Sequence, residues 1–414
     1  MTVSANVLAW VDKRFPASKM FKEHMSEYYA PKNFNFWYFF GVFALVVLVN
    51  QLLTGIWLTM FYEPSADGAF DAVQYIMYDV SYGDILRYLH STGASAFFLV
   101  VYLHMFRGLL YGSYKAPREL VWIIGMFIYL ILMAEAFFGY LLPWGQMSYW
   151  GAQVIFNLAS AIPVYGADLI EWIRGDYLIS GATLNRYFAV HVVALPIILL
   201  GLIVAHIIAL HEVGSNNPDG VDIKEKKDEN GIPLDGIPFH PYYTVHDLQG
   251  IVVFLFVFLA VVFFFPDGGG YFLEKPNFEP ANGLKTPDHI APVWYFTPFY
   301  AILRSVPDKL LGVIAMGAAI AFLFLLPWLD RSPVRSMRYK GLISRIALGI
   351  FVICFVLLGV CGVKPPDGDF IFGLSWKVTG QICTAFYFLW FITMPFIPMF
   401  EKTKTPPERL KVTH

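Results

Sequence analysis

Two apolar stretches decide the fold: YLHSTGASAFFLVVYLHMFRGLL at residues 88–110 and YFAVHVVALPIILLGLIVAHIIAL at residues 187–210. Each is long enough to cross roughly 30 Å of hydrocarbon as a single helix. The first carries His90 and His104, 14 residues apart, and the second carries His191 and His206, 15 residues apart. Four imidazoles in apolar helices are either hydrogen-bonded core residues or ligands, and the rest of the sequence bears on that choice.

The composition excludes an ordinary soluble protein. Of 414 residues, 57% are hydrophobic and only 14% are charged, which is more apolar surface than one core can bury, so we expect an integral membrane protein. The cysteines, Cys354, Cys361 and Cys383, form no paired-ligand spacing, and this argues against a zinc site or a covalently attached haem. The basic segments are typical of membrane flanks rather than of a nucleic-acid surface. The first 15 residues contain no apolar core of a cleavable signal.

Hydropathy predicts an all-α protein with eight transmembrane helices. The expected spans are 36–61, 88–110, 120–142, 187–210, 248–265, 310–329, 346–363 and 378–400. An amphipathic helix along the bilayer surface is expected before them. The charged linker after the fourth span divides the chain into residues 1–211, a four-helix half, residues 212–246, the linker, and residues 247–414, a second four-helix half.

The distribution of lysine and arginine predicts the orientation. Under the eight-span arrangement, 20 of the 29 basic residues lie on the side that holds both termini. Because basic residues concentrate on the cytoplasmic side, both termini are expected in the cytoplasm, or in the matrix of a mitochondrion.

Helical geometry pairs the histidines. A 14-residue step turns about 1400° and rises roughly 21 Å, so His90 and His104 face almost the same way at two depths. The second and fourth spans run in the same direction, and His90 is therefore level with His191, and His104 with His206. A metal plane held between facing imidazoles satisfies both rings inside lipid, and haem is the cofactor that fills such a gap. We therefore predict that the first four spans form a di-haem four-helix bundle, although any one histidine could instead be hydrogen-bonded locally.

The fourth span breaks the symmetry. Its 15-residue step adds about 100° relative to the second span. Pro196 lies between His191 and His206, and a kink there could restore the facing arrangement.

Glycines in the first and third spans repeat the histidine spacing. Gly41 and Gly55 lie 14 residues apart, as do Gly125 and Gly139. Glycine lets a flat macrocycle approach the backbone, whereas small residues in membrane helices also serve plain helix contact.

Arginines flank the predicted haem levels: Arg87, Arg107 and Arg186. They are candidates for pairing with haem propionates. The alternative is that their side chains simply extend to the membrane interface.

Several motifs resemble the cytochrome b subunit of the cytochrome bc-type quinol:cytochrome c oxidoreductase, which is respiratory complex III. The matching segments are RYLHSTGAS around His90, GYLLPWGQMSYWGA at 139–152, RYFAVH ending at His191, HEVGSNNP at 211–218, FHPYYTVHD at 239–247 and HIAPVWYFTPFYAILRSVPDK at 289–309. They are distributed over nearly the whole chain, and the unsplit eight-span length resembles the respiratory type.

The resemblance implies an electron-transfer enzyme with two quinone sites. Quinol would be oxidised at an outer site, with one electron passing to a Rieske iron–sulfur protein and one through two non-covalent b-type haems to quinone at an inner site, coupled to proton translocation. His90 and His191 would bind the outer haem, and His104 and His206 the inner haem. The implied partners are the Rieske protein, a c-type cytochrome and membrane lipid, in a dimeric complex. Ubiquinone is the expected quinone and a bacterial inner membrane the expected location, a mitochondrial inner membrane being the second choice.

For the outer quinone site, the family uses the segment that reads PVWY here. The resemblance implies site residues Phe137, Tyr140, Pro292, Trp294, Tyr295 and Tyr300. The usual motif carries an acid where this chain has Val293, and valine cannot accept a proton. Glu135, the one charged residue in the apolar core of the third span, is our candidate replacement, because ionisable residues inside spans are costly and often functional. The alternative is a structural carboxyl group paired with a neighbouring helix.

For the inner quinone site, the resemblance implies His211, Ser215, His246 and Asp247. Family members commonly have lysine at the position of His246, and histidine titrates closer to neutrality. Without the resemblance, these would be ordinary polar groups at helix ends.

Two other classes of protein are weaker fits. A transporter could use Glu135 and the histidines to relay protons, but inverted-repeat and broken-helix signals are absent from the sequence. A di-haem membrane anchor is disfavoured by the PVWY and PWGQ segments.

Overall fold

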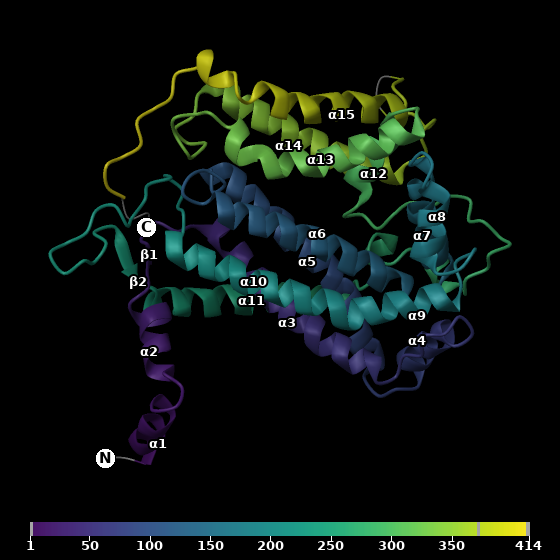
Figure 1. The fold of residues 1–414 in the computed structure, drawn as a ribbon, viewed down its shortest axis with the longest axis horizontal. Helices are drawn as coiled ribbons and strands as arrows, with labels where there is room; N and C mark the ends of the chain where they lie inside the picture. The colour runs from purple at the N-terminus through teal and green to yellow at the C-terminus, as the bar shows by residue number, and fades with distance from the viewer. Residues whose placement is uncertain (1–2, 371–372, 411–414) are drawn as a thin grey trace.

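The computed structural model describes residues 3–370 and 373–410 as an array of long helices with short connecting elements (Figure 1). The α-helices are α1 (Val3–Asp12), α2 (Ala17–Phe21), α3 (Phe39–Thr59), α4 (Ala69–Tyr78), α5 (Gly83–Tyr111), α6 (Glu119–Leu141), α7 (Gln146–Leu158), α8 (Gly166–Arg174), α9 (Gly181–Ala189), α10 (Leu195–Val213), α11 (Thr244–Phe264), α12 (Thr297–Ser305), α13 (Lys309–Leu329), α14 (Leu342–Val363) and α15 (Trp376–Thr393). Three π-helical turns are η1 (Lys22–Ser26), η4 (Val190–Ala194) and η5 (Phe239–Tyr243). The 3₁₀ turns are η2 (Phe36–Tyr38), η3 (Ala159–Ala161), η6 (Gly268–Gly270), η7 (Lys275–Phe278) and η8 (Ile397–Met399).

Seven helical segments of the described chain are long and apolar enough to cross a membrane. They are Phe36–Thr59, Gly83–Tyr111, Glu119–Leu141, Gly181–Val213, Phe239–Phe264, Lys309–Leu329 and Leu342–Val363. The chain is therefore a multi-pass membrane protein, as predicted. The eighth expected span corresponds to α15, an 18-residue helix that lies alongside α14 but is not among these seven (Figure 1).

The N-terminal segment, the linker and the C-terminal segment meet at one end of the helix array. Strands β1 (Tyr29–Pro31) and β2 (Gly236–Pro238) pair in antiparallel register. The Asp235 carboxylate beside them receives Lys32 Nζ at 2.8 Å and Arg409 Nε at 2.9 Å. Because Lys32 precedes α3 and Arg409 follows α15, the chain enters and leaves the array at the same end.

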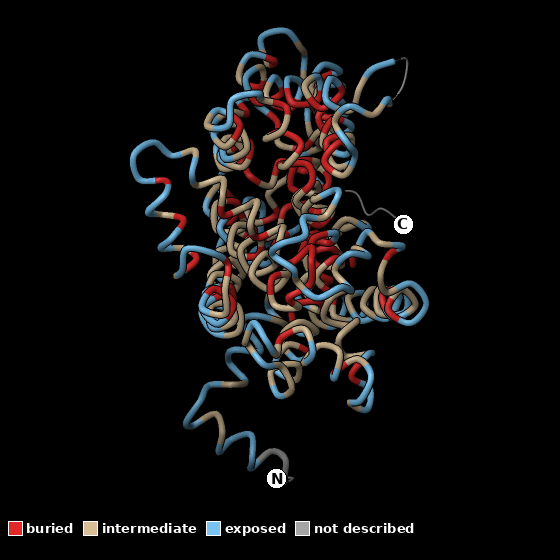
Figure 2. Tube along the Cα trace, turned by 90° about the vertical axis from the view of Figure 1, so that its right-hand side faces the viewer, coloured by how far each residue is buried: buried red, intermediate tan, exposed pale blue. Residues whose placement is uncertain are grey.

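One hydrophobic core joins the two halves of the chain. Buried residues of α3, α5 and α6 belong to the same cluster as buried residues of α13, α14 and α15. Trp122 of α6 also donates its indole N–H to the Leu323 carbonyl oxygen of α13 at 2.8 Å. The cysteines, Cys354, Cys361 and Cys383, are buried in this core as free thiols. Figure 2 shows the buried residues gathered where the helices meet, while the N-terminal helices project from the body with exposed surfaces.

A long loop between α11 and α12 is fastened to the segment between α6 and α7. The Gln146 amide donates to the Glu279 carbonyl and the Ala281 amide donates to the Trp144 carbonyl, both at 3.0 Å. The Asn277 side-chain oxygen accepts from the Ser148 amide at 2.8 Å. These bonds fix the backbone of residues 277–281 against the chain that follows the C-terminal end of α6.

A buried ion cluster fastens the two halves at the opposite end. Asp330, which is 6% exposed, accepts hydrogen bonds from Tyr114 at 2.6 Å and Lys340 at 2.5 Å and pairs with Lys115 at 3.3 Å. Burial would raise the pKa of Asp330, but Lys340 and Lys115 outweigh that effect and hold the pKa below its ordinary 3.8.

Asp330→Asn should destabilise the protein by about 3–5 kcal/mol, because it leaves the buried Lys340 ammonium without its carboxylate. Thermal unfolding in detergent measures the change. The exposed carboxylate of Asp367 provides the control, and Asp367→Asn should stay within about 0.5 kcal/mol of the parent. Since folding lowers the pKa of Asp330, its stabilising effect is present above pH 3.8 and is lost as the pH falls through the lowered value. Equal stability of the two variants at neutral pH would contradict this role.

Candidate functional site

The structure brings the four histidines together in two pairs. The ring centres of His90 in α5 and His191 in η4 lie 6.3 Å apart, with an angle of 87° between the ring planes. Those of His104 in α5 and His206 in α10 lie 6.4 Å apart at 64°. Both separations suit one metal ion held between two imidazoles by bonds of about 2 Å. The pairing is the one that helical geometry predicted.

In the first pair, the Nδ1 atom of each ring already has a hydrogen-bond partner. His90 Nδ1 lies 3.0 Å from the Thr54 hydroxyl, and His191 Nδ1 lies 2.9 Å from the Glu135 carbonyl oxygen. A metal-binding histidine characteristically uses one ring nitrogen for the metal and donates the other N–H to such a partner. In the second pair, the buried Nδ1 atoms of His104 and His206 have no partner among the described residues.

Each histidine ring faces a glycine on a neighbouring helix. A Cβ atom added to Gly55 would lie 3.1 Å from His90 Cε1, and one added to Gly41 would lie 3.2 Å from His104 Cε1. The corresponding distances are 3.2 Å from Gly125 to His206 and 2.5 Å from Gly139 to His191. The four glycines therefore keep side-chain atoms out of the space around the imidazoles.

The 15-residue step in the fourth span is absorbed by a π-helical turn. Residues 190–194 form η4, which contains His191, and α10 begins directly after it with Pro196 in its first turn. A π-turn accommodates one additional residue in a helix, and such turns are frequent at functional sites. Pro196 lacks the N–H of an α-helical hydrogen bond, which favours the wider turn just before it.

The donor set fits haem rather than a metal held by protein ligands alone. Within the described ranges, no three His, Cys, Asp or Glu side chains come together as a metal site. Each level offers only two imidazoles, so the other ligands of a metal must come from a planar cofactor that carries its own nitrogens. At the first level a cavity of about 310 Å³ adjoins His90, His191, Gly55 and Gly139.

The candidate propionate partners differ in position. Arg87 lines the cavity. Arg107 is half-buried, and its Nε atom has no partner among the described residues. Arg186 is exposed and donates to the Trp172 carbonyl at 3.3 Å, so its side chain turns toward α8.

Glu135 projects into the same cavity beside a predicted metal ligand. Its Oε1 atom lies 3.2 Å from His191 Nδ1, and its buried Oε2 atom has no partner among the described residues. The carboxyl group thus contacts an imidazole and has one oxygen free to accept a proton.

Some of the predicted outer-site residues line the cavity and others do not. Tyr140, Val293 and Tyr295 line it. The Tyr295 ring stacks on Phe98 at 3.9 Å, and its carbonyl accepts from Tyr102 at 2.5 Å.

The other members of that predicted set are not among the residues that line the cavity. Trp294 donates its indole N–H to the Ser95 hydroxyl at 3.1 Å, and Pro292 is the half-buried residue at the start of the motif. Phe137 packs on Phe156, and Tyr300 lies under the Arg304 guanidinium, so neither lines the cavity.

Sequence reasoning missed a carboxylate at the outer site. Glu274, in the long loop before α12, accepts a 2.7 Å hydrogen bond from the Tyr140 hydroxyl. Burial raises the pKa of Glu274 to about 7, although the bond from Tyr140 acts in the opposite direction. Nothing in the spacing of residues around 274 signals this contact, because it depends on how the loop folds back on α6.

The predicted inner-site residues are covered by the N-terminal segment. The Tyr28 ring stacks on His211 with centres 4.3 Å apart, and its hydroxyl lies 3.1 Å from that of Ser215. His24 approaches His211 with 3.4 Å between their Nδ1 atoms. Tyr28 and His24 are further residues that the sequence did not reveal.

The other two inner-site residues belong to α11. The Tyr38 hydroxyl donates to Asp247 Oδ2 at 3.2 Å, and the buried Asp247 Oδ1 has no partner among the described residues. His246 meets the edge of Tyr243 at 5.8 Å, and Tyr243 also contacts Tyr38. Aromatic contacts from Tyr28 through Phe239 to Tyr243 connect this group with His211.

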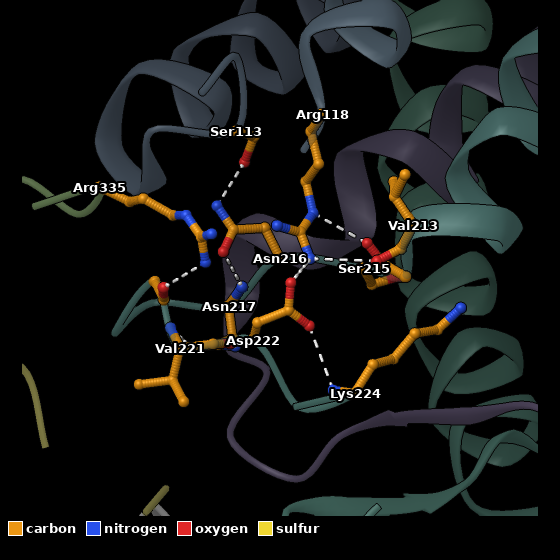
Figure 3. A network of polar contacts seen from close by, with 12 residues as sticks. Ser113, Arg118, Val213, Ser215, Asn216, Asn217, Val221, Asp222, Lys224 and Arg335 are labelled. Atoms are coloured by element: carbon orange, nitrogen blue, oxygen red, sulfur yellow. Dashed lines mark hydrogen bonds and ion pairs between the residues drawn. The ribbon is translucent and has the colours of Figure 1, made fainter. Parts of the chain in front are cut away.

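A polar network fixes the chain where it leaves α10 (Figure 3). Arg118 donates to the Gly214 carbonyl at 2.9 Å, and Asn216 donates to the Tyr111 carbonyl at 2.9 Å. Asp222 pairs with Arg118 at 3.7 Å and receives the Lys224 amide at 3.1 Å. This network holds the backbone on both sides of Ser215.

The fold and the paired imidazoles define a multi-pass membrane protein of the haem-binding, electron-transferring class. Two family descriptions match the chain: "Cytochrome b/b6/petB" over residues 25–214 and "Cytochrome b(C-terminal)/b6/petD" over residues 280–388. The chain belongs to the cytochrome b family, and haem binding follows from that membership. The resemblance predicted from its motifs is confirmed.

Known cytochrome b sequences and a solved structure align with almost the whole length of this chain. A cytochrome b of Allochromatium vinosum is 61% identical over 97% of this chain and 98% of its own length, and one of Rickettsia bellii is 48% identical over 98% and 96%. A solved structure described as "Hyperthermophilic respiratory Complex III" matches with a TM-score of 0.87 and 38% identity, over 95% of this chain and 99% of that one. The chain is therefore a cytochrome b of the respiratory complex III type, a subunit of an oxidoreductase.

Gly139→Ala should weaken haem binding, because the new Cβ atom would lie 2.5 Å from His191 Cε1 and force the ring to move. Overpacking of about 1–3 kcal/mol corresponds to roughly 5- to 150-fold in affinity. Haem extracted per purified chain measures the loss. Gly201→Ala on α10 is the control, since a Cβ atom there meets nothing within 4 Å. Equal haem content in both variants would remove Gly139 from the cofactor site.

Proposed function

We propose that this chain is the di-haem cytochrome b subunit of a proton-translocating respiratory quinol:cytochrome c oxidoreductase. The observation that carries the proposal is the pair of imidazole levels, each with two histidines from different helices and two facing glycines. One such level would serve a single-haem protein, whereas two levels on the same four helices suit electron transfer across a membrane.

The ligands would be His90 with His191 and His104 with His206. Non-covalent b-type haems at these positions would supply one-electron redox chemistry. Thr54 and the Glu135 carbonyl would orient the first two rings through Nδ1 and leave Nε2 for the metal. Propionate pairing is favoured for Arg87 and Arg107 over Arg186, whose side chain turns toward α8.

The outer site would bind quinol in the part of the cavity that Tyr140, Val293 and Tyr295 line, and the part next to His90 and His191 would hold the haem. Tyr140 and Tyr295 border the space. The resemblance would add Phe137, Pro292, Trp294 and Tyr300 to the site, although these four do not line the cavity. Glu135 would accept a proton there, since its free Oε2 atom is buried within the same region. Apolar walls exclude water from the reacting hydroxyls.

 The inner site would reduce quinone between α10 and α11. Its polar groups are His211, Ser215, His246 and Asp247, and the Asp247 Oδ1 atom is free to exchange a proton. Tyr28 would hold His211 in place through its stacked ring. The substrate would be ubiquinone at both sites.

The topology follows from the same proposal. With α15 as an eighth span, the chain would cross the membrane an even number of times, in agreement with the meeting of Lys32, Asp235 and Arg409 at one end. The excess of basic residues places that end in the cytoplasm of a bacterium, with the chain in the inner membrane. Residues 1–211 would form the haem-binding half, 212–246 the linker with the inner-site loop, and 247–414 the half with the PVWY loop.

The partners follow from the redox chemistry. The chain has three cysteines, all of them buried free thiols, and so offers no ligand set for an iron–sulfur cluster or a c-type haem. A Rieske iron–sulfur protein and a c-type cytochrome would supply these centres in a dimeric complex.

The haem number tests the proposal directly. A reduced-minus-oxidised spectrum of the purified complex should show b-type haem at two per chain. Replacing His104 by Leu should remove the haem of the second level, because His206 would be left as the one imidazole of that pair. A single haem per chain in the parent protein would refute the di-haem assignment.

Glu135→Gln should slow quinol oxidation roughly 100-fold, because an amide cannot accept the proton. Both haems should remain, since the Glu135 backbone carbonyl still faces His191. Steady-state turnover of quinol with cytochrome c, together with the haem spectrum, measures both effects. Unchanged turnover would leave Glu135 as a structural partner of His191.

A further inference from the structure

A second carboxylate, Glu274, lies next to the proposed outer site. The Tyr140 hydroxyl donates to Glu274 Oε2 at 2.7 Å, and Tyr140 itself lines the cavity. Glu274 is half-buried, so its carboxyl group is neither sealed in the core nor fully in water. A proton from the cavity can therefore reach Glu274 through a single phenol.

The backbone around Glu274 is held in place from both directions. Downstream, Asn277 receives the Ser148 amide through its side chain, and the Gln146 amide donates to the Glu279 carbonyl. On the Tyr140 side, the Ser148 hydroxyl donates to the Tyr140 carbonyl at 2.5 Å. Because Ser148 contacts both segments, Tyr140 and the loop carrying Glu274 share one support, and their contact does not depend on a free loop end.

The position where the family usually has an acid is apolar here. Val293 is 3% exposed and lines the same cavity as Tyr140. Its side chain packs in the main core and can neither accept nor donate a proton. The chemistry that a carboxylate would perform at residue 293 has to come from another group around this cavity.

We propose that Glu274, acting through Tyr140, accepts one of the two quinol protons at the outer site, and Glu135 would accept the other. This inference rests on the proposed quinol oxidation. It assigns the missing acid to the loop between α11 and α12 rather than to the PVWY segment.

The transfer balances as a relay. The O–H bond of one quinol hydroxyl breaks and its proton binds the Tyr140 oxygen, while the original Tyr140 proton moves to Glu274 Oε2. Tyr140 ends unchanged, and the carboxylate becomes a carboxylic acid. The electrons leave quinol to the two one-electron acceptors of the proposed reaction, the Rieske protein and the haem chain. The acid then returns its proton to water on the outer side.

The surroundings of Glu274 support a role near neutral pH. Burial raises its pKa to about 7, against the effect of the Tyr140 hydrogen bond. The other titratable groups nearby are Tyr295, whose pKa is raised first by burial and then by Glu274, and the adjacent exposed Lys275. A group with a pKa near the working pH is well suited to taking up and releasing protons.

A purely structural role for Glu274 predicts a different result. In that case the amide of Glu274→Gln would still accept the Tyr140 hydroxyl and activity would persist. Under the relay, the same variant keeps the hydrogen bond but cannot take the proton. The variant therefore separates the two roles without removing the contact.

Glu274→Gln in the complete complex should reduce quinol oxidation roughly 10- to 100-fold while the haem spectrum stays that of the parent. The rate of the parent should rise with pH through about 7 as Glu274 loses its proton, and the variant should lack that rise. Val293→Glu placed in the Glu274→Gln background should recover much of the rate, because residue 293 lines the same cavity. Glu279→Gln, an exposed carboxylate of the same loop, is the matched control.

The outcomes are distinguishable. Parent-like turnover of Glu274→Gln, with an unchanged pH profile, overturns the relay and leaves the proposed function intact. No quinol oxidation by the parent complex refutes the proposed function itself. Should Glu274→Gln fail to assemble, Glu274→Asp supplies the test: a restored pH-dependent rate supports the relay, and a pH-independent rate overturns it.

Discussion

The need to satisfy buried imidazole nitrogens governs the first four spans. A ring inside an apolar bundle has two nitrogens, and leaving either without a partner is costly. Thr54 and the Glu135 carbonyl each contact one nitrogen of a ring at the first level, and the two ring centres lie 6.3 Å apart beside Gly55 and Gly139. In the proposed arrangement a haem would satisfy the remaining nitrogens. Helix spacing, glycine positions and the polar residues among apolar neighbours all answer that single requirement.

The same requirement explains the irregular backbone of the fourth span. The histidines of α5 are 14 residues apart, so a regular helix with a 15-residue step could match one level and would turn the other ring away. A π-turn at residues 190–194 takes up the additional residue beside His191, and Pro196 removes the N–H that would favour an ordinary α-turn there. The irregularity is therefore confined to one end of the helix, and the geometry around His206 is that of a regular α-helix.

The sequence predicted the contacts that depend on helical periodicity, and it did not predict the contacts that depend on tertiary packing. Histidine and glycine spacings of 14 residues predicted which rings and glycines meet, because in a straight helix the sequence spacing determines the side of the helix on which each residue lies. Seven of the eight expected spans have the length and composition of membrane helices, and α15 falls short because polar residues interrupt its apolar pattern. Spacing could not reveal that Arg186 turns to α8, that Tyr28 covers His211, or that Glu274 reaches Tyr140. The first of these contacts joins two helices, α9 and α8, and the other two join a helix to a terminal segment or a loop whose path is set by distant hydrogen bonds.

A metal ligand and a proton acceptor place different demands on a sequence. A ligand must approach from one direction at a bond length of about 2 Å, which fixes it to a particular turn of a particular helix. A proton acceptor needs only hydrogen-bond reach, directly or through one intervening group, so it can come from any segment that borders the cavity. In the proposed reaction the carboxylates stand on α6, as Glu135, and on a loop, as Glu274, while residue 293 is free to be valine. The loop position places Glu274 one hydrogen bond away from the cavity, through Tyr140, whereas Glu135 contacts His191 directly.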